Sequence, residues 1–560
     1  MYFKKYDSLP LPTTGHLHIL KTGYVYWEKT SSWDNKNKRP KYGRISIGKL
    51  DPEDSTRFYP NDKYFEIFSG QKKKIEDKKE VDQPLPQPSN KSFTQNFGGY
   101  IALIRSLERS GALASLKQQW PDQWENICAL AAHAVLSQDS TAQSFPFWSF
   151  SNYCGKGGSL NDSQISTVFQ EIGFDQEEIY DFLYSFQQNY MKSSFSKGDT
   201  LSVVGDSTNI NTSCQNNELA QFGEAKVDED LPIVNTFVLA DLDTGIPLYF
   251  EEYFGSLIDK SQIAATLEQT VDLGYKKLYA VLDRGHTSRE NLKKLQEGDY
   301  EFAMMMPGSL KKVKELIPQN QDIKDNMDYY IPEEKIFGKS LGKIEILERD
   351  FYGYIYYDSF RADEEKISIL NTVQMYKEKV EQRKRYTDKM KEQFSKWLII
   401  EPADNAKGFT VEINRQSVQK ALNETGWFVV IDNTDKGSSE TIIRLRKRDK
   451  AEKEFCRLKT HLGMDQGRVH STEEFRGKML TAFVGLIMVE SFRALTRYSM
   501  EKRISDTVET DLALLNKYQI QQNKNQDGWL PSYAMTKKQK ALFASLGLKE
   551  KDVKDMIYGL

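Results

Sequence analysis

Two aspartates follow short, largely apolar runs that are typical of β-strands. Asp206 comes after Leu201–Gly205, and Asp283 comes after Lys277–Leu282. Neighbouring strands lie about 5 Å apart, so carboxylates at adjacent strand ends can point into one cleft. Carboxylate oxygens are the ligands that Mg²⁺ and Mn²⁺ prefer. With a third carboxylate, such a site can bind two cations, activate a water or a 3'-hydroxyl and stabilise the leaving oxygen in phosphodiester cleavage.

A third carboxylate is expected on a helix. Arg448, Glu452 and Lys459 are separated by four and seven residues, offsets that place all three on one helical face. A carboxylate between two cations on that face can bind a metal while the cations bind phosphates. A ladder of surface ion pairs produces the same spacing. Glu454 and Glu490 compete with Glu452, and composition does not choose among them.

Two further aspartates compete as metal ligands. Asp241 and Asp243 lie between two apolar runs, and Thr244 and Gly245 follow them. An aspartate that closes a strand is most often a turn or cap residue. The sequence therefore favours a hairpin turn for this pair, and the same structural alternative applies to Asp206 and Asp283 taken singly.

Taken together, the motifs resemble those of the DDE transposases of bacterial insertion sequences, in the cut-and-paste group that carries a YREK signature. The matching motifs are Gly205-Asp206-Ser207-Thr208, Asp243-Thr244-Gly245-Ile246-Pro247, Asp283-Arg284-Gly285, Arg448-x3-Glu452-x6-Lys459 and Lys459-Thr460-His461-Leu462. The three acids lie far apart in the chain, and the longer interval falls between Asp283 and Glu452. Each motif is short, and it is their order and separation, over roughly residues 195 to 500, that carry the resemblance.

The resemblance implies an RNase H-like α/β core, with a mixed sheet, helices on both faces and a mostly β insertion between the second Asp and the Glu. It implies that Asp206, Asp283 and Glu452 are the catalytic acids and bind two Mg²⁺ or Mn²⁺ ions. Arg448 and Lys459 would then bind DNA phosphates near the scissile end. One position departs from the signature, because Leu445 stands where a Tyr is expected.

Relatives of this type can pass through a DNA hairpin in which a flipped base stacks on a Trp of the insertion. Trp427, which precedes Glu452 in the chain, is the candidate for that role. Stacking an unpaired base on an aromatic ring is worth about 1 to 3 kcal/mol. A Trp within a strand is more commonly buried in the core.

A second DNA-binding surface is predicted near the N-terminus, where basic residues adjoin Trp33 and Tyr42. The residues are Lys36, Lys38, Arg39, Lys41 and Arg44. Such a mixture suits contacts with a DNA backbone or groove, although a charge run is usually a solvated face. A second basic segment, from Arg444 to Lys459, has eight basic and three acidic residues. His286 and His461 lie near the motifs, but their spacing does not indicate zinc.

The expected elements follow from apolar periodicity. Expected strands are Tyr24–Trp27, Arg44–Ile47, Leu201–Gly205, Pro232–Ala240, Ile246–Phe250, Lys277–Leu282, Phe351–Tyr357, Phe409–Ile413 and Trp427–Ile431. Expected helices are Ile263–Leu273, Ser288–Leu295, Glu364–Lys396, Asp449–Lys459 and Thr472–Tyr498. Strand, hairpin, helix, strand and helix in that order predict a mixed sheet with helices packed against it.

Length and composition are those of a multidomain globular protein. The chain has 560 residues, of which 39% are hydrophobic and 28% charged, with a net charge of −3. The longest apolar run, Ala482–Val489, is shorter than the roughly 18 to 20 residues of a membrane span. Four scattered cysteines predict reduced thiols and no zinc ribbon. We therefore expect a cytoplasmic protein that is not bound to membranes, and the resemblance implies a bacterial, nucleoid-associated one.

Six segments are expected. They are a basic β-rich DNA-binding module and linker (1–90), a helical DNA-binding domain (91–197), the first part of the catalytic core (198–300), an insertion (301–440), the second part of the core (441–500) and a helical tail (501–560). The resemblance implies a homodimeric transposase that binds terminal inverted repeats, cleaves the DNA ends and joins the 3'-hydroxyls to target DNA. The alternatives are a metal-dependent DNA nuclease without strand transfer and a non-catalytic DNA-binding protein derived from a transposase.

Overall fold

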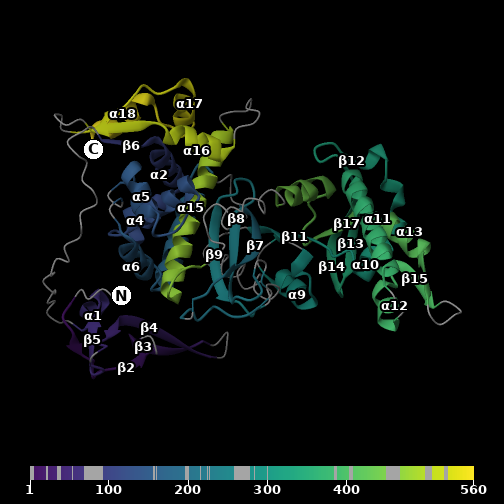
Figure 1. Ribbon diagram of the computed structural model, residues 1–560, viewed down its shortest axis with the longest axis horizontal. Coiled ribbons are helices and arrows are strands. Elements are labelled where there is room, and N and C mark those ends of the chain that lie inside the picture. The colour runs from purple at the N-terminus through teal and green to yellow at the C-terminus, as the bar shows by residue number, and fades with distance from the viewer. Residues whose placement is uncertain are drawn as a thin grey trace.

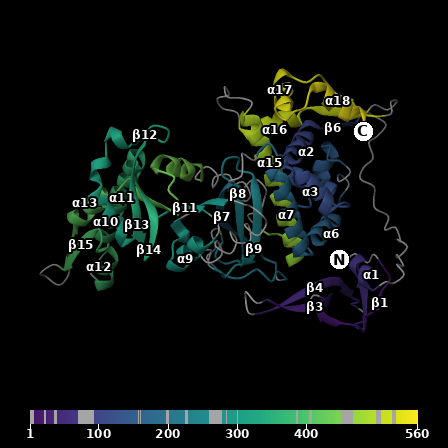
Figure 2. The ribbon, with the colours of Figure 1, turned by 180° about the vertical axis from the view of Figure 1, so that it is seen from behind.

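The structure is a computed structural model of the whole chain. It describes residues 6–20, 23–34, 39–52, 54–68, 93–155, 158, 160–195, 201–214, 216–223, 225, 228–257, 278–282, 284–298, 301–383, 387–402, 408–448, 467–498, 507–522 and 528–560. Along its longest axis the insertion lies at one end and a helical region at the other, and β7 to β9 lie between them (Figure 1 and, from behind, Figure 2).

A nine-stranded mixed sheet runs through the centre of the molecule, in the order β12-β13-β14-β17-β11-β10-β7-β8-β9. β7, β8 and β9 are antiparallel to one another, whereas β10 is parallel to β7 and β11 is parallel to β10. The five strands are β7 (Leu201–Asn211), β8 (Ile233–Asp241), β9 (Pro247–Phe254), β10 (Leu278–Leu282) and β11 (Glu301–Met305). The strands predicted for β8, β9 and β10 and the hairpin between β8 and β9 are confirmed, whereas β7 continues past the predicted end at Gly205 to Asn211.

Four strands of the insertion extend the same sheet through antiparallel pairing. They are β17 (Trp427–Asp432), β14 (Arg349–Tyr357), β13 (Ile336–Ile346) and β12 (Tyr330–Ile331). The insertion also contains the hairpin of β15 (Leu398–Pro402) and β16 (Phe409–Ile413). The strands predicted for β14, β16 and β17 are confirmed.

The expectation of a mostly β insertion is wrong, because four helices share it with the strands. They are α10 (Lys311–Gln319), α11 (Ser359–Glu381), α12 (Asp388–Phe394) and α13 (Arg415–Asn423). The charged segment of α11 is rich in Glu and Lys, which favour helix. Asp358 caps its N-terminus by accepting a hydrogen bond from the Arg361 backbone N–H, and Val373 and Val380 are buried. Helix propensity and one apolar stripe therefore outweigh the strand-rich surroundings.

The other predicted helices around the core have different outcomes. The helix expected over Ser288–Leu295 is confirmed as α9 (Arg289–Glu297), which Ser288 caps by accepting a hydrogen bond from the Asn291 backbone N–H. The helices expected over Ile263–Leu273 and Asp449–Lys459 lie outside the described residues. Those two therefore stay predictions.

The helical region surrounds one long helix, α15 (Thr472–Tyr498), whose predicted bounds are confirmed. It packs against α2 (Gly98–Ser110), α4 (Trp124–Ser137), α6 (Asp162–Ile172) and α16 (Val508–Asn516). The region also contains α3 (Ala112–Gln119), α5 (Phe145–Ser151) and α7 (Gln176–Met191). By length and composition α15 is apolar enough to cross a membrane, but 94% of its apolar window is buried inside the protein. This burial is what the central helix of a globular domain shows.

The C-terminal segment folds back on the start of the helical region. β18 (Gln519–Gln522) pairs with both β6 (Phe93–Asn96) and β19 (Leu530–Pro531). The helices α17 (Lys537–Ser545) and α18 (Glu550–Tyr558) follow. Leu542, Phe543 and Ile557 belong to the same apolar core as α2 and α4. The end of the chain is therefore part of a packed helical unit.

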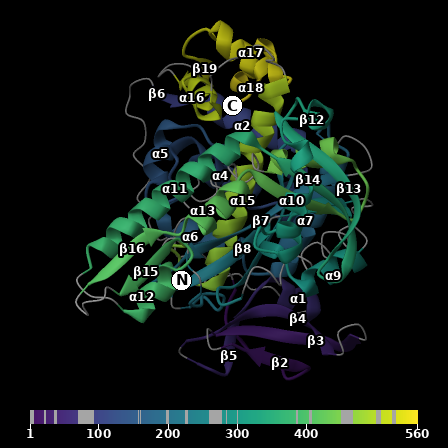
Figure 3. The same cartoon turned by 90° about the vertical axis from the view of Figure 1, so that its right-hand side faces the viewer.

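The N-terminal module is a five-stranded antiparallel sheet with one short helix, in the order β1-β5-β4-β3-β2. Its elements are β1 (Leu9–Pro10), β2 (His16–Ile19), β3 (Tyr24–Asp34), β4 (Arg39–Leu50), β5 (Arg57–Pro60) and α1 (Asp62–Ile67). Lys63 forms ion pairs of 2.9 and 3.0 Å with Asp175 and Glu178 at the start of α7. The module lies at the opposite end of the molecule from α17 and α18 (Figure 3).

Candidate functional site

Asp206 lies in the middle of β7 and not at its end, which corrects the sequence expectation. The strand continues to Asn211, and each residue from Gly205 to Asn211 has a partner on β8; Asp206 is opposite Val238. The second half of β7 is largely polar, and Ser207, Asn209 and Asn211 are buried there. The Asn211 side chain donates a hydrogen bond of 2.7 Å to the Asp228 carbonyl, and Ser207 and Asn209 also have contacts. The polar residues after Gly205 predicted that the strand ends there, but in the structure they continue it. The Asp206 side chain is outside the described part of the structure.

β10 ends at Leu282, and Asp283 lies outside the described residues. β10 and β7 are parallel neighbours in which Val281 is opposite Val204 and Tyr279 is opposite Ser202. Asp206 and Asp283 therefore each come two residues after a directly paired position. β10 is short and fully buried where it is described, so its apolar run was readily predicted.

A helix over residues 438–448 covers one face of the sheet next to these strands. Its Ile442 and Leu445 join Val204 and Val281 in one apolar cluster. Leu445, at the position where the signature expects Tyr, is 1% exposed. It packs the helix onto the sheet and does not present a group to solvent.

Glu452, the third predicted catalytic acid, lies outside the described residues, as does its competitor Glu454. Lys459, the second predicted phosphate-binding residue, lies outside them too. Arg448 is the last described residue of the helix. It is 5% exposed and makes contacts within the fold. The structure thus places the helix that leads toward Glu452 but not the predicted helical face itself.

Three basic residues of the 444–459 segment pair with acids of the fold. Arg444 binds Glu440 at 2.6 Å, Lys447 binds Asp243 at 2.5 Å, and Arg446 forms an ion pair with Asp358. Ion-paired cations are less available to phosphates than solvated ones. For these three residues the structure supports the structural interpretation of the basic run.

Asp241 caps the turn between β8 and β9. One carboxylate oxygen accepts the backbone N–H groups of Asp243 and Thr244 at 2.8 Å each, and the other accepts the Tyr190 hydroxyl at 3.1 Å. Burial raises the pKa of the Asp241 carboxyl, while these hydrogen bonds lower it. The carboxylate is thus occupied within the turn, and Asp243 is paired with Lys447. The geometry favours the turn interpretation over metal ligation for both.

Glu490 is fully buried in α15, where it forms an ion pair with Arg493. Gly245, with φ +77°, lies against this pair. A Cβ at Gly245 would approach an Arg493 guanidinium nitrogen to 2.9 Å. The structure therefore places Glu490 in a structural ion pair behind the hairpin turn.

Trp427 begins β17 and is 6% exposed. Its ring lies 5.0 Å from that of Tyr357, the residue directly opposite on β14. This is a cross-strand aromatic pair in the extended sheet. Stacking on a flipped base would require the indole to leave Tyr357.

The predicted N-terminal basic surface falls at the β3–β4 hairpin. Lys36 and Lys38 lie outside the described residues, and the backbone places Arg39, Lys41 and Arg44 on β4. Their side chains are outside the described part of the structure. The prediction that these five residues bind DNA stays a prediction.

Sequence reasoning missed a buried pair between β9 and α15. A carboxylate oxygen of Glu252 lies 3.8 Å from Arg476 Nε, and Glu252 is 5% exposed. Among the described residues, its second oxygen and the Arg476 Nε have no hydrogen-bond partner. Burial raises the pKa of Glu252 to about 7, against the lowering effect of Arg476. Glu252 lies at an alternate position of its strand, and no residue near it in the sequence indicates that a helix much later in the chain buries it.

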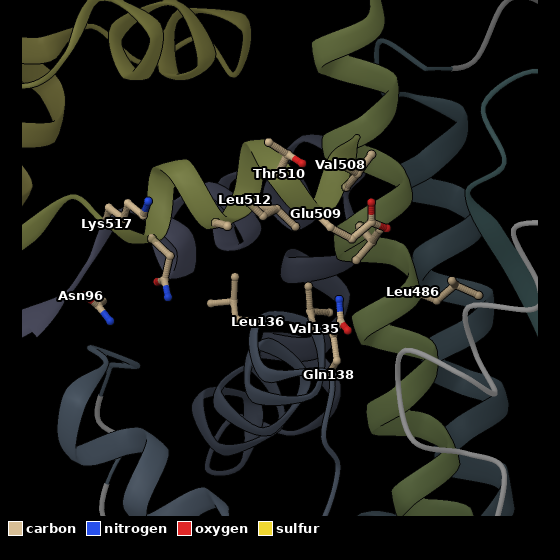
Figure 4. Close-up of a pocket in the computed structure, with 13 residues that line it drawn as sticks. Asn96, Val135, Leu136, Gln138, Leu486, Val508, Glu509, Thr510, Leu512 and Lys517 are labelled. Atoms are coloured by element: carbon tan, nitrogen blue, oxygen red, sulfur yellow. The ribbon is translucent and has the colours of Figure 1, made fainter. Parts of the chain in front are cut away.

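A cavity of about 450 Å³ lies among α4, α15 and α16. Leu136, Leu512 and Lys517 are among the residues that surround it (Figure 4). None of the described residues that line it belongs to β7, β10 or the 438–448 helix. It is therefore a separate feature from the strands that carry the aspartates.

Within the described ranges, no group of three His, Cys, Asp or Glu residues is placed to hold a metal. Asp283, Glu452 and the Asp206 side chain are outside those ranges, so this observation does not concern the predicted triad.

Comparison with known proteins gives a similarity in structure but none in sequence. No family model and no curated protein matches the chain. The structure is similar to a solved piggyBac transposase synaptic complex with hairpin DNA, with a TM-score of 0.32 and 8% sequence identity over 75% of this chain and 70% of that chain.

Proposed function

We propose that this protein is a transposase: it binds the ends of a mobile DNA element, cleaves them by metal-dependent phosphodiester hydrolysis and joins the freed 3'-hydroxyls to target DNA. The proposal is carried by one observation. Asp206 lies on β7 and Asp283 follows the last described residue of β10 in the sequence, and these two strands are parallel neighbours in which Val204 is opposite Val281. This pairing supports the proposal that the two acids, distant in the sequence, belong to one site.

The strand order supports an RNase H-like core. The segment β9-β8-β7-β10-β11 has three antiparallel strands followed by two parallel ones. This mixed sheet agrees with the core that the sequence motifs imply. The remaining strands, β17 to β12, belong to the insertion and lengthen the sheet at the β11 edge.

Glu452 is proposed as the third ligand because of the helix that precedes it. The 438–448 helix packs on the sheet, with Ile442 and Leu445 against Val204 of β7 and Val281 of β10. Arg448, its last described residue, is four residues before Glu452, and four residues span at most about 14 Å. The segment that carries Glu452 therefore follows a helix that contacts both strands.

The chemistry of the donors fits a hard divalent cation. Asp206, Asp283 and Glu452 would supply only carboxylate oxygens, which suit Mg²⁺ or Mn²⁺. Two such ions would lower the pKa of a bound water or 3'-hydroxyl and stabilise the leaving oxygen. Arg448 and Lys459 would bind the phosphates on either side of the scissile bond, and the N-terminal β3–β4 hairpin would contact the DNA end. Trp427 would stack on a flipped base if a hairpin forms.

The reaction needs no further reactant. Attack by water on phosphorus breaks the bond to the 3'-oxygen and leaves a 3'-hydroxyl and a 5'-phosphate. Attack by that 3'-hydroxyl on a target phosphodiester forms the new P–O bond and breaks the bond from the same phosphorus to the target's 3'-oxygen, which leaves as a target 3'-hydroxyl. Acting on two ends implies a homodimer. A nuclease that stops after hydrolysis is the second candidate, and the buried Leu445 at the usual Tyr position keeps a non-catalytic DNA-binding protein as the third.

The test uses as substrate the DNA that flanks the gene, where the proposal expects matching inverted repeats. We expect Asp206→Asn, Asp283→Asn and Glu452→Gln to abolish Mg²⁺-dependent cleavage and to leave binding of the DNA ends intact. Asp243→Asn is the matched control, because Asp243 is an exposed acid of the same core and is expected to keep cleavage. Full activity in the three variants rejects the site.

Precut ends with 3'-hydroxyls and a plasmid target separate the candidate functions. Joined products support transposition. Cleavage of intact ends without joining supports the nuclease, and tight end binding without any metal-dependent product supports the non-catalytic protein.

A further inference from the structure

Helix α11, at the insertion end of the molecule (Figure 1), presents apolar side chains to solvent. Val373 and Val380 are on its packed side and are buried. On another side Phe360 is 71% exposed, Ile367 60% and Met375 52%. These three follow one another after seven and eight residues, offsets that place them on one helical face. The fold therefore buries one apolar side of α11 and leaves a second one exposed.

A shallow hollow lies on this exposed side. The described residues that line it all belong to α11, and they are Glu364, Ile367, Ser368, Asn371, Thr372 and Met375. Ser368 and Thr372 are one turn apart and have short side chains, whereas Ile367 and Met375 are long. Helices pack by placing the long side chains of one into the gaps on the other. The hollow therefore has the shape that a second helix needs.

Two charges on this side of α11 are left over. Within the described part of the chain, Glu364 and Lys379 form no ion pair, and both are exposed. Glu364 precedes Asn371 by seven residues, and Lys379 follows Thr372 by seven. The acid and the base therefore lie equally far from the middle of the hollow, on opposite sides. Most other charged residues of α11 pair within the helix, Arg361 with Glu365, Lys366 with Asp363 and Lys377 with Glu381.

We infer that α11 is the contact surface for α11 of a second copy of this chain, in an antiparallel pair whose two-fold axis passes beside Asn371 and Thr372. A two-fold axis places residues at equal distances from it opposite one another, and each contact occurs twice. Met375 of one copy then lies over Ser368 of the other. Glu364 of one copy faces Lys379 of the other. Long side chains thus meet short ones, and acids meet bases.

The charges favour a second copy over a partner of single charge. An acidic partner would meet Glu364 and a basic one Lys379, whereas the antiparallel copy pairs both. One helix pair is small compared with the roughly 1,200 Å² or more that a stable interface buries, so we expect weak, reversible association. The inference names the surface that joins two copies, and it rests on the proposed function only for the use of two DNA ends.

Sedimentation velocity of the full-length protein, without DNA or metal, tests the pairing by charge reversal. Glu364→Lys and Lys379→Glu each place like charges opposite one another in both contacts. We expect each to raise the dimer dissociation constant about tenfold. The double variant, and an equimolar mixture of the two single variants, again pair opposite charges and should return to within about twofold of wild type. Leu370→Glu is the matched control, because Leu370 is also exposed on α11 but does not line the hollow. It should leave the constant unchanged.

Cross-linking tests the position of the axis. A residue beside a two-fold axis lies next to its own copy, so Asn371→Cys should form a disulfide between two chains when copper phenanthroline and oxygen oxidise the thiols. Leu370→Cys is adjacent in sequence and lies off the hollow, so it should not cross-link more than wild type. The wild-type chain measures the background from its four native cysteines.

Three results overturn the inference. They are a wild type that stays monomeric at about 100 µM, charge reversals that leave association unchanged, and Leu370→Glu weakening it as much as the reversals do. If a charge variant does not fold, the two cysteine variants decide, and equal cross-linking in both then counts against the pairing. Failure of the proposed function looks different, because the wild type would then lack cleavage whatever its state of association.

Discussion

Replacing Glu252 with Gln should stabilise the protein at neutral pH and leave it nearly unchanged in acid. The Glu252 carboxylate is buried between β9 and α15, 3.8 Å from Arg476, and one of its oxygens has no hydrogen-bond partner in the described part of the chain. Burial raises its pKa from 4.5 to about 7. The folded state therefore disfavours the charged form, which a neutral Gln avoids.

The sign and size follow from linkage. Because the folded pKa lies above the unfolded one, the folded state binds more protons between pH 4.5 and 7, and wild-type stability falls as the pH rises through that window. The rise in the Glu252 pKa from 4.5 to about 7, at about 1.36 kcal/mol for each pKa unit, gives about 3 kcal/mol of lost stability above pH 7. Glu252→Gln lacks this loss, so its advantage should grow from pH 4.5 to 7 and then stay constant.

The assay is the melting temperature of wild type and Glu252→Gln from pH 4.5 to 8.5 in one buffer series. Glu345→Gln, at an exposed position on β13, is the control and should show no pH-dependent difference from wild type. A difference for Glu252→Gln that is constant across the range, or that shrinks as the pH rises, refutes the reasoning.

Three smaller predictions concern the frame of the site. Gly245→Ala should lower the free energy of unfolding by about 1 to 3 kcal/mol, because φ is positive there and a Cβ would meet Arg493. Chemical denaturation measures this loss, and Gly308→Ala is the control, because nothing lies within 4 Å of the atom added there. Trp427→Ala should lower the free energy of unfolding by about 3 to 5 kcal/mol, and Trp427→Phe should lower it less, as measured by the same method. An equal and negligible loss for both variants contradicts the buried pair with Tyr357. Asn235→Ala removes hydrogen bonds to three backbone carbonyls and should raise amide hydrogen exchange in residues 254–257, whereas unchanged exchange contradicts that role.

The sequence predicted best where periodicity alone decides the element. Trp427–Ile431 is a wholly apolar run, and Thr472–Tyr498 has the apolar pattern of a long helix. Both elements could be predicted without knowing what they pack against. The turn at Asp241 to Gly245 was likewise predictable, because its residue types leave few other conformations. These elements account for much of the frame around the core sheet and for the helix at the centre of the helical region.

Prediction failed where distant neighbours decide the outcome. Ser207 to Asn211 are largely polar, and only pairing with β8 makes them strand, so Asp206 was placed at an end that does not exist. The insertion was expected to be mostly β, whereas α11 and three further helices share it with the strands. The contacts of Arg444 with Ser202 and of Glu252 with Arg476 join residues that are remote in the chain, and no local pattern announces them.

Iron-directed cleavage of the chain tests the central claim, that Asp206, Asp283 and Glu452 bind metal together. Fe²⁺ with ascorbate and peroxide generates radicals that cut the backbone beside the bound ion, and the fragments are mapped by mass spectrometry. The account predicts cuts near residues 206, 283 and 452 that excess Mg²⁺ suppresses and Asp206→Asn removes. Cuts near only one of the three acids, or cuts that Mg²⁺ does not affect, would contradict it.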